Sequence, residues 1–505
     1  MKRCCGVLLP ISSLPSRYGI GSFSREAFEF IDFLSEAGQS CWQILPMGQT
    51  GYGDSPYQSV STFAGNPYFI DLNELIEEGY ITAAEAEDCN FGTEPRYVDY
   101  SQLYAHRYPL LKKAYLNSPY RNQTEKLSEK QTVQKKEFDA FIDKEKEWLS
   151  DYAMFCAIKD YFEGISYLEW PEAVRLRRPE AMKHYGDLLS EEIRFYEFLQ
   201  YLFDRQWKKI RDYAASKNIK IIGDLPIYVA ADSADAWSHP ELFKLDENGY
   251  PTEVAGCPPD AFSETGQLWG NPVYRWDYHR KTGYSWWIRR IERCFHLCDI
   301  IRIDHFRGFA GYYAIPYGNE TAEFGTWQPG PGVELFSAIR EKLGEKEIIA
   351  EDLGYITEDV FQLLKDTGFP NMKVLQFAFY AGQDNNFLIH HYDHNCVVYT
   401  GTHDNETTNG WYAGLSEADR SFVDTYADIR EPEEAAQKLI RLALVSAADT
   451  VIIPMQDYLG LGNEARINYP STLGGINWQW RLKRGELTQK LAAEMKKNAA
   501  AYQRC

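Results

Sequence analysis

The chain has 505 residues, of which 44% are hydrophobic and 15% aromatic, so it contains enough apolar material for a large buried core. A formal net charge of −20 disfavours nucleic acids and anionic membranes as partners, because both are bound by basic faces. No run of about 18 apolar residues occurs in the sequence, so no membrane-spanning helix is predicted.

Short apolar segments alternate with amphipathic helical segments along the chain. Strands are predicted at 4–10, 41–47, 219–229, 299–308, 347–354, 373–379, 396–403 and 450–455. Helices are predicted at 24–37, 285–296, 357–367 and 432–448. Eight strand–helix units predict an α/β fold of the (β/α)₈ TIM barrel type, with right-handed connections. A doubly wound open sheet is the alternative, but no G-x-G-x-x-G motif follows the first strand.

The segments between these units are too long for simple barrel connections, so we expect large insertions in one catalytic domain that spans 1–505. A Gly-, Pro- and Tyr-rich loop followed by a charged helical subdomain occupies about 49–217. Two further loop insertions are expected at 230–283 and 309–332. The charge runs of the helical insertion are most simply solvated helix faces.

The ten cysteines are scattered and include no C-x-x-C pair, so a zinc site built on thiolates is not expected. The apolar run near the N-terminus is short and stops at Pro10, which fits a first strand better than a secretion signal. We therefore expect a reduced, cytoplasmic enzyme with no metal and no cofactor. The sequence predicts no particular oligomeric state.

Acidic residues follow four of the predicted strands: Asp224, Asp304, the pair Glu351–Asp352, and Asp404 after His403. In a barrel these strand ends converge on one rim, so the acids would form a cluster. Clustered acids serve either metal-assisted hydrolysis or glycosyl transfer through paired carboxylates. No H-x-H or H-x-x-x-H pair occurs on a strand, and the loops are rich in Tyr, Trp, Asn and Gly, which favours sugar chemistry.

Two of these strand ends allow a prediction about charge. Arg302 and Asp304 are two residues apart on one strand, so they point to the same side, and the guanidinium should lower the pKa of Asp304. An acid that stays ionised is suited to be a nucleophile. Glu351 and Asp352 are adjacent in the sequence, so their negative charges should repel each other. Together with burial, this repulsion should raise the pKa of one of the two carboxyl groups so that it can donate a proton. Their spacing alone does not decide which of the two is the acid.

Several long motifs of the chain resemble one known family. They are GVLLPISSLPS, WQILPMGQTGYGDSPYQSVSTFAGNPYFIDL, GDLPIYVAADSADAW, GCPPDAFSETGQLWGNPVYRW, RIDHFRGF, AEDLG, GTHDN, ARINYPST and NWQWR. With these motifs, from residue 6 to 481, the sequence closely resembles the 4-α-glucanotransferases (amylomaltases, or disproportionating enzymes) of glycoside hydrolase family 77 in the α-amylase clan. GDSPYQ and GCPPDAFSETGQLWGNP are particular to the glucanotransferases.

The resemblance implies roles for individual residues. Asp304 would be the nucleophile, Glu351 the general acid and base, and Asp404 the stabiliser of the transition state. Four further side chains would line the donor sugar site: Asp224, Arg302, His305 and His403.

The resemblance also implies contacts outside the strand ends. Acceptor-side contacts would come from the segment 52–57, through Tyr52, Ser55 and Tyr57. The loop 255–269, which contains Asp260 and Trp269, would cover the site and exclude water. Arg466 and Asn468 would reach the donor sugar.

The implied activity is transfer of an α-1,4-glucan segment between maltooligosaccharides by a retaining mechanism. In that mechanism a covalent glucosyl-enzyme forms on the nucleophile, and a second saccharide then takes the glycan. The alternatives are net hydrolysis at the same site, a catalytically silent glucan-binding protein, and a metal-dependent hydrolase.

Overall fold

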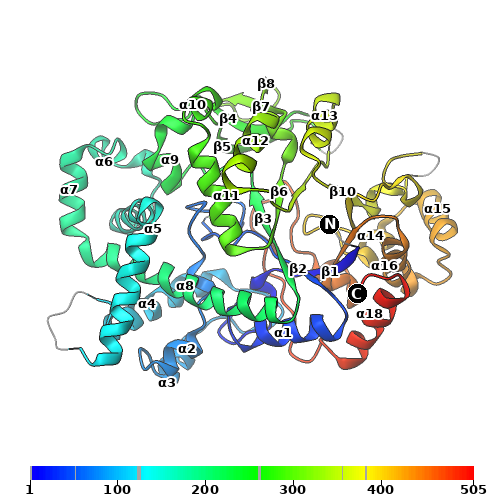
Figure 1. Ribbon diagram of the computed structural model, residues 1–505, viewed down its shortest axis with the longest axis horizontal. Helices are drawn as coiled ribbons and strands as arrows, with labels where there is room; N and C mark the ends of the chain where they lie inside the picture. The colour runs from blue at the N-terminus through cyan, green and yellow to red at the C-terminus, as the bar shows by residue number, and fades with distance from the viewer. Residues whose placement is uncertain (1–2, 52, 122–126, 260–262, 355, 381–383) are drawn as a thin grey trace.

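A closed parallel barrel forms the centre of the molecule (Figure 1). The computed structural model describes residues 3–51, 53–121, 127–259, 263–354, 356–380 and 384–505. Within them, eight strands close in the order β1-β12-β11-β10-β9-β6-β3-β2. These strands are β1 (Cys4–Leu8), β2 (Cys41–Gln43), β3 (Lys220–Pro226), β6 (Ile300–Asp304), β9 (Ile348–Ala350), β10 (Asn371–Val374), β11 (Cys396–Tyr399) and β12 (Thr450–Pro454). Each overlaps a predicted strand, so the barrel is confirmed and the open sheet is wrong.

The barrel strands are buried on both faces, as parallel strands covered by helices are. Every residue of β9, β11 and β12 is buried. At Gly6 on β1 the neighbouring strand comes especially close, because a Cβ there would lie 2.4 Å from the carbonyl oxygen of Cys41 on β2. Only glycine fits at this point without separating the two strands.

Helices surround the barrel. Those that follow or precede its strands are α1 (Arg25–Glu36), α11 (Ser285–Leu297), α12 (Val333–Leu343), α13 (Glu358–Thr367), α14 (Thr408–Gly414), α15 (Glu417–Ala427), α16 (Ala435–Val445), α17 (Met455–Tyr458) and α18 (Gln489–Ala501). As the sequence predicts, Gly38 follows the end of α1, with a φ of +67° that glycine adopts without a Cβ clash. Among the described residues, no helix is both long and apolar enough to cross a membrane.

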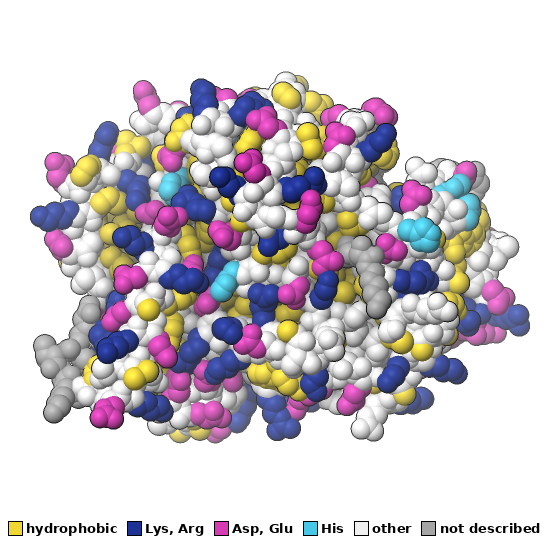
Figure 2. Space-filling model, in the orientation of Figure 1, with side chains coloured by type: hydrophobic (Ala, Val, Ile, Leu, Met, Phe, Trp, Pro, Cys, Tyr) yellow, Lys and Arg dark blue, Asp and Glu magenta, His cyan; other side chains and the backbone are white. Residues whose placement is uncertain are grey.

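A helical lobe, inserted in the sequence between β2 and β3, forms the left side of Figure 1. Its helices are α2 (Leu72–Glu77), α3 (Ala83–Glu87), α4 (Tyr100–Asn117), α5 (Glu129–Tyr161), α6 (Glu172–Arg175), α7 (Pro179–Leu188) and α8 (Ser190–Ser216). The ring of Tyr201 on α8 packs against Phe138 and Phe141 on α5. The visible face of the molecule shows acidic and basic side chains interspersed (Figure 2), which fits the expectation of solvated charged faces.

A second, antiparallel sheet lies beside the barrel, at the top of Figure 1. Its order is β5-β4-β7-β8, with β4 (Glu253–Cys257), β5 (Gln267–Pro272), β7 (Gly311–Pro316) and β8 (Thr326–Pro329). In the sequence, the short helix α9 (Ala234–Ser238) precedes β4, and the short helix α10 (Trp276–Lys281) follows β5. The sequence predicts only loops at 230–283 and 309–332, and this expectation is corrected. The pairing of β4 with β7 joins residues more than 50 positions apart, so no local pattern reveals it.

Candidate active site

Three acidic side chains reach one end of the barrel from three strands. Asp304 is the last residue of β6, Glu351 follows β9, and Asp404 lies in the loop after β11. β6 and β9 are hydrogen-bonded, with Ile303 opposite Ala350, so Asp304 and Glu351 leave adjacent strands at the same level. All three acids line one cavity of about 630 Å³. The structure thus brings the strand-end acids together.

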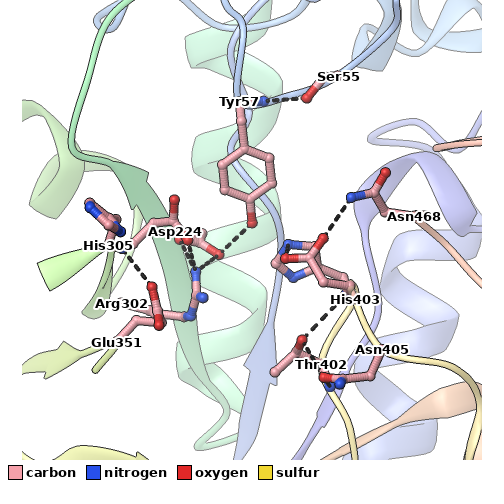
Figure 3. Close-up of polar contacts among 12 residues, drawn as sticks. Ser55, Tyr57, Asp224, Arg302, His305, Glu351, Thr402, His403, Asn405 and Asn468 are labelled. Carbon is pink, nitrogen blue, oxygen red and sulfur yellow. Dashed lines mark hydrogen bonds and ion pairs between the residues drawn. The ribbon is translucent and has the colours of Figure 1, made fainter. Parts of the chain in front are cut away.

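Arg302 joins two carboxylates at the site, and Figure 3 shows it between Asp224 and Glu351. Its Nη1 donates to both oxygens of Asp224 on β3, at 2.8 and 2.7 Å, and to Oδ1 of Asp304 at 3.1 Å. The hydroxyl of Tyr57 donates to Oδ2 of the same Asp224 at 2.8 Å. This hydrogen bond links the segment that carries Tyr57 to Asp224 and Arg302.

Asp224 and Arg302 do not line the cavity, contrary to the sequence expectation. Their side chains are 0% and 3% exposed, against 27% for Asp304. The register explains the difference: Asp224 pairs with Arg302, whereas Asp304 pairs with Pro226, two residues nearer the mouth. The ion pair therefore lies one layer deeper and supports the groups above it.

The charge of Asp304 depends on burial more than on Arg302. Burial raises the pKa of Asp304 to about 6, although Arg302 acts to lower it. The expectation of a lowered pKa is therefore wrong. The guanidinium is shared with Asp224, and the negative charges of Asp224 and Asp404 act in the same direction as burial. Above pH 6 the carboxylate is still largely ionised.

Glu351 is held at the cavity by two backbone N–H groups. Its Oε2 accepts from the backbone N–H of His305 at 2.6 Å, and its Oε1 accepts from that of Leu353 at 2.7 Å. Burial, joined by the charge of Asp304, raises the pKa of Glu351 to about 7, while Arg302 and the two N–H groups oppose the shift. A carboxyl with this pKa exchanges a proton near neutral pH.

Asp352 is turned away from the cavity. Its Oδ1 accepts from the backbone N–H of Met372 at 2.9 Å, and its Oδ2 accepts from Nδ2 of Asn371 at 3.1 Å. Both partners belong to β10. Spacing in the sequence leaves Glu351 and Asp352 equivalent, and the structure separates them.

Asp404 carries the most firmly held negative charge. Asn468 Nδ2 donates to its Oδ1 at 2.6 Å, and Nε2 of His403 lies 3.3 Å from its Oδ2. Burial opposes ionisation, but His403 and Asn468 outweigh it and hold the pKa of Asp404 well below its usual range. Burial also acts to lower the pKa of His403, and Asp404 raises it overall. Arg466 donates from Nη2 to the backbone oxygen of Asp404 at 2.7 Å, so it fixes the loop.

Aromatic rings form the walls of the cavity. The ring of Tyr57 stacks on His403 with centroids 5.2 Å apart, and Trp478 lies at a tilt to both. Trp269 meets His305 edge to face at 4.8 Å. Burial lowers the pKa of His305 to about 3, so this histidine is neutral. Neutral rings with polar edges are suited to the apolar faces and hydroxyls of sugars.

The other expected contacts have different outcomes. Ser55 does not line the cavity; its Oγ accepts from the backbone N–H of Tyr57 at 3.3 Å and so supports the turn. Tyr52 and Asp260 lie outside the described residues.

Several lining residues were not singled out from the sequence: Gln58, Tyr228, Gln267, Asn271, Pro470, Ser471 and Trp478. All seven stand inside the quoted motifs, which is the signal that could have identified them.

The described lining of the cavity does not present a set of metal ligands. Within the described parts of the chain, the one group of three ligating side chains close enough to share an ion is Asp384, His390 and His391. None of these residues lines the cavity. The two cavity histidines instead contact aromatic rings and, for His403, Asp404.

Comparisons with known proteins agree with this geometry. A family model described as 4-alpha-glucanotransferase matches residues 9–488. The 4-alpha-glucanotransferase of Clostridium butyricum is 49% identical over 498 residues, 98% of this chain and 99% of the relative. That of Thermus thermophilus is 48% identical over 511 residues, 100% of this chain and 99% of the relative. The solved amylomaltase from Streptococcus agalactiae in complex with acarbose is 44% identical, with a TM-score of 0.95 and full coverage of both chains. The chain therefore belongs to glycoside hydrolase family 77 and is a 4-alpha-glucanotransferase.

Proposed function

We propose that the protein disproportionates maltooligosaccharides and other α-1,4-glucans by a double displacement centred on Asp304. One observation carries the proposal: Asp304, Glu351 and Asp404 leave three different strands and face one cavity. Retaining glycosyl transfer needs a charged carboxylate and a protonated one beside the same anomeric carbon. The raised pKa of Glu351 and the low pKa of Asp404 fit this division of roles.

In the first step Asp304 attacks the anomeric carbon of the donor, and the bond to the leaving oxygen breaks. Glu351 gives its proton to that oxygen, so the departing saccharide leaves as a neutral alcohol. The ring gains positive charge during the step, and the fixed charge of Asp404 stabilises it. The product is a glucosyl ester on Asp304, with Glu351 ionised.

In the second step the 4-hydroxyl of an acceptor saccharide replaces the first leaving group. Glu351 takes the hydroxyl proton, the acceptor oxygen attacks the anomeric carbon, and the ester bond to Asp304 breaks. Two inversions restore the α configuration. The wall formed by Tyr57, Trp269 and Trp478 offers an acceptor sugar a surface on which it can compete with water.

The substrate class rests on the lining of the cavity and on the relatives. The lining combines aromatic rings with amide and carboxylate groups and presents no cluster of cationic side chains. The amylomaltase of Streptococcus agalactiae was solved with acarbose.

We propose that 1–505 works as one catalytic unit in the cytoplasm, with the insertions 49–217, 230–283 and 309–332 shaping its rim. No disulfide joins the cysteines of the described residues, which supports that compartment.

Incubation with maltotriose, followed by separation of the products, tests the proposal. Transfer produces glucose together with a ladder of longer oligosaccharides. Glucose and maltose alone would mean hydrolysis, and unchanged maltotriose would mean binding without turnover. Asp304→Asn serves as the control, because it should still bind maltotriose while forming no product.

A further inference from the structure

A second cluster of chemically active side chains lies outside the cavity. Asp384, His390 and His391 belong to the segment between β10 and β11, and all three are exposed. Their ligating atoms lie within 4.8 Å of one another. The cluster is on the lobe that carries α15, at the right of Figure 1, where Figure 2 shows histidine side chains at the surface. The transfer mechanism makes no use of these residues.

The carboxylate and the second imidazole are already in contact. Nε2 of His391 lies 2.6 Å from Oδ1 of Asp384. The rings of His390 and His391 have centroids 4.2 Å apart and are tilted by 53°. A metal ion between Asp384 and His391 would replace the hydrogen that they share, as metal binding to protonated ligands does. The exposed side chains can adjust to the bond lengths that an ion requires.

The first imidazole has an outer partner that fixes its orientation. Nδ1 of His390 lies 2.9 Å from the hydroxyl of Tyr426 on α15. With Nδ1 occupied in this way, Nε2 is the nitrogen available to an ion. Metal-binding histidines commonly use their second nitrogen in such a contact, which orients the ring.

The loop that carries the cluster is anchored by its own hydrogen bonds. Nδ2 of Asn385 donates to the backbone oxygen of Ala378 at 3.0 Å, and Oδ1 of Asn385 accepts from the backbone N–H of Phe387 at 2.9 Å. The hydroxyl of Tyr392 donates to the backbone oxygen of Phe387 at 2.6 Å. The cluster therefore has a defined backbone before any ion binds.

We propose that Asp384, His390 and His391 form a binding site for one divalent transition-metal ion of the zinc class. Two imidazole nitrogens and one carboxylate oxygen suit Zn²⁺, whereas Mg²⁺ and Ca²⁺ prefer ligands that are all oxygen. Three protein ligands leave a coordination position for water. The ion would fasten the segment 384–391 to α15 through Tyr426 and would stabilise this lobe, with no part in glycosyl transfer.

Calorimetric titration of the full chain with ZnCl₂ tests the site. The wild type should bind one ion, and Asp384→Asn and the double variant H390A/H391A should each bind at least tenfold more weakly. Tyr426→Phe, which keeps the ring but removes the outer contact, should weaken binding about 10–100-fold. His184→Ala on α7 is the matched control, because His184 is also exposed but stands apart from the cluster, and it should bind like the wild type.

Cobalt supplies a second readout. With CoCl₂ the wild type should show visible absorption bands of nitrogen and oxygen ligation, and H390A/H391A should lose them. Zn²⁺ should raise the midpoint of thermal unfolding of the wild type but not of the double variant. Transfer activity without added metal should be the same in both. Binding that is absent in the wild type, unchanged in H390A/H391A, or accompanied by the near-ultraviolet band of cobalt–thiolate ligation would overturn the proposal.

Discussion

At the base of the active site one guanidinium serves two carboxylates. Arg302 contacts both oxygens of Asp224 and one oxygen of Asp304 through the same nitrogen. Burial raises the pKa of Asp304 to about 6, and the charge of Arg302, which is shared between the two carboxylates, offsets only part of this rise. Among the described hydrogen bonds of Glu351, none comes from a cationic side chain. Burial raises the pKa of Glu351 to about 7. The two acids thus ionise in the order that the mechanism requires.

The pH dependence of kcat/KM should reflect this order. Activity should rise as the pH passes about 6, because Asp304 loses its proton and becomes a nucleophile. It should fall as the pH passes about 7, because Glu351 loses the proton it must donate. Initial rates of transfer from maltotriose between pH 4 and 9 measure the profile, and its limbs report the pair of acids as a unit. A rate that keeps increasing above pH 8 would contradict the assignment of Glu351.

Replacement of Asp224, which shares Arg302 with Asp304, should shift the rising limb of the pH profile. In Asp224→Asn the guanidinium of Arg302 faces Asp304 alone, so the pKa of Asp304 should fall and the rising limb should move to lower pH. The descending limb should move less, since Arg302 makes no direct contact with Glu351 among the hydrogen bonds of the described residues. The same rate profile measures the shift.

Tyr57→Phe is the matched control for this shift. It removes a neutral hydrogen bond to the same carboxylate and leaves the charge of Asp224 in place. Its acid limb should stay where it is in the wild type. An equal shift in both variants would mean that hydrogen bonding, and not the division of the Arg302 charge, sets the pKa.

The sequence identifies the acids but not their depth. Apolar runs that end in Asp304, Glu351 and Asp404 are visible as strand ends, and the barrel brings such ends together. The burial of Asp224 below the cavity follows from the register between β3 and β6, which no local pattern encodes. The choice between Glu351 and Asp352 likewise depends on β10, because Met372 and Asn371 bind Asp352 from that strand.

At the scale of elements, a buried carboxylate from the end of β12 holds the loop that carries Asp404. Asp457 on α17 is 2% exposed. Its Oδ2 accepts from the hydroxyls of Thr400 and Thr408 at 2.5 and 2.7 Å, and its Oδ1 accepts from the backbone N–H of Thr408 at 2.7 Å. Thr400 and Thr408 bracket His403 and Asp404. Asp457 is therefore expected to act as a positioning residue for Asp404.

Asp457→Asn should lower kcat more than it raises KM. The amide replaces one acceptor oxygen with a donor, so either both threonine hydroxyls or the backbone N–H of Thr408 lose their acceptor, and the loop shifts. A displacement of about 1 Å in a catalytic group can reduce the rate about 100-fold. Steady-state kinetics separate kcat from KM. Asp424→Asn, which alters a carboxylate bound to Tyr412 on another helix, is the control. A folded Asp457→Asn enzyme with normal kcat would remove Asp457 from this role.

The two sheets differ in how far the sequence predicts them. Each barrel strand is an apolar run that stands out on its own, and its neighbours follow from the rule for parallel strand–helix units. The strands β4, β5, β7 and β8 are rich in Gly and Pro, and β4 pairs with β7 across more than 50 residues. Their pattern of burial is also mixed, as in β5, so alternation is weak.

At the scale of the whole molecule, three segments distant in sequence build one wall. Tyr57 comes from the insertion after β2, Trp269 from β5, and Asn468 and Trp478 from the stretch after β12. A barrel with short connections would leave Asp304 and Glu351 open to water. We therefore expect the insertions to influence the balance between transfer and hydrolysis.

Trp269→Ala should change that balance. Loss of the indole that rests on His305 opens one wall and admits water to the glucosyl-enzyme. We expect the proportion of hydrolysis among the products of maltotriose to rise several-fold while the pH profile keeps its limbs. Quantification of reducing ends against total oligosaccharide measures it. A reduced rate with an unchanged ratio of transfer to hydrolysis would show that this wall does not govern access of water.

Trapping of the glucosyl-enzyme is the sharpest test of whether Asp304 is the nucleophile. The test uses the variant Glu351→Gln with maltotriosyl fluoride as the donor. The first step needs no acid, because fluoride leaves without a proton. The second step is blocked, because no base remains to activate an acceptor. The variant should accumulate a covalent glycosyl adduct, mass spectrometry should locate the adduct on the peptide containing Asp304, and Asp304→Asn should prevent its formation. An adduct on another residue, or turnover of the fluoride by Asp304→Asn, would contradict the account.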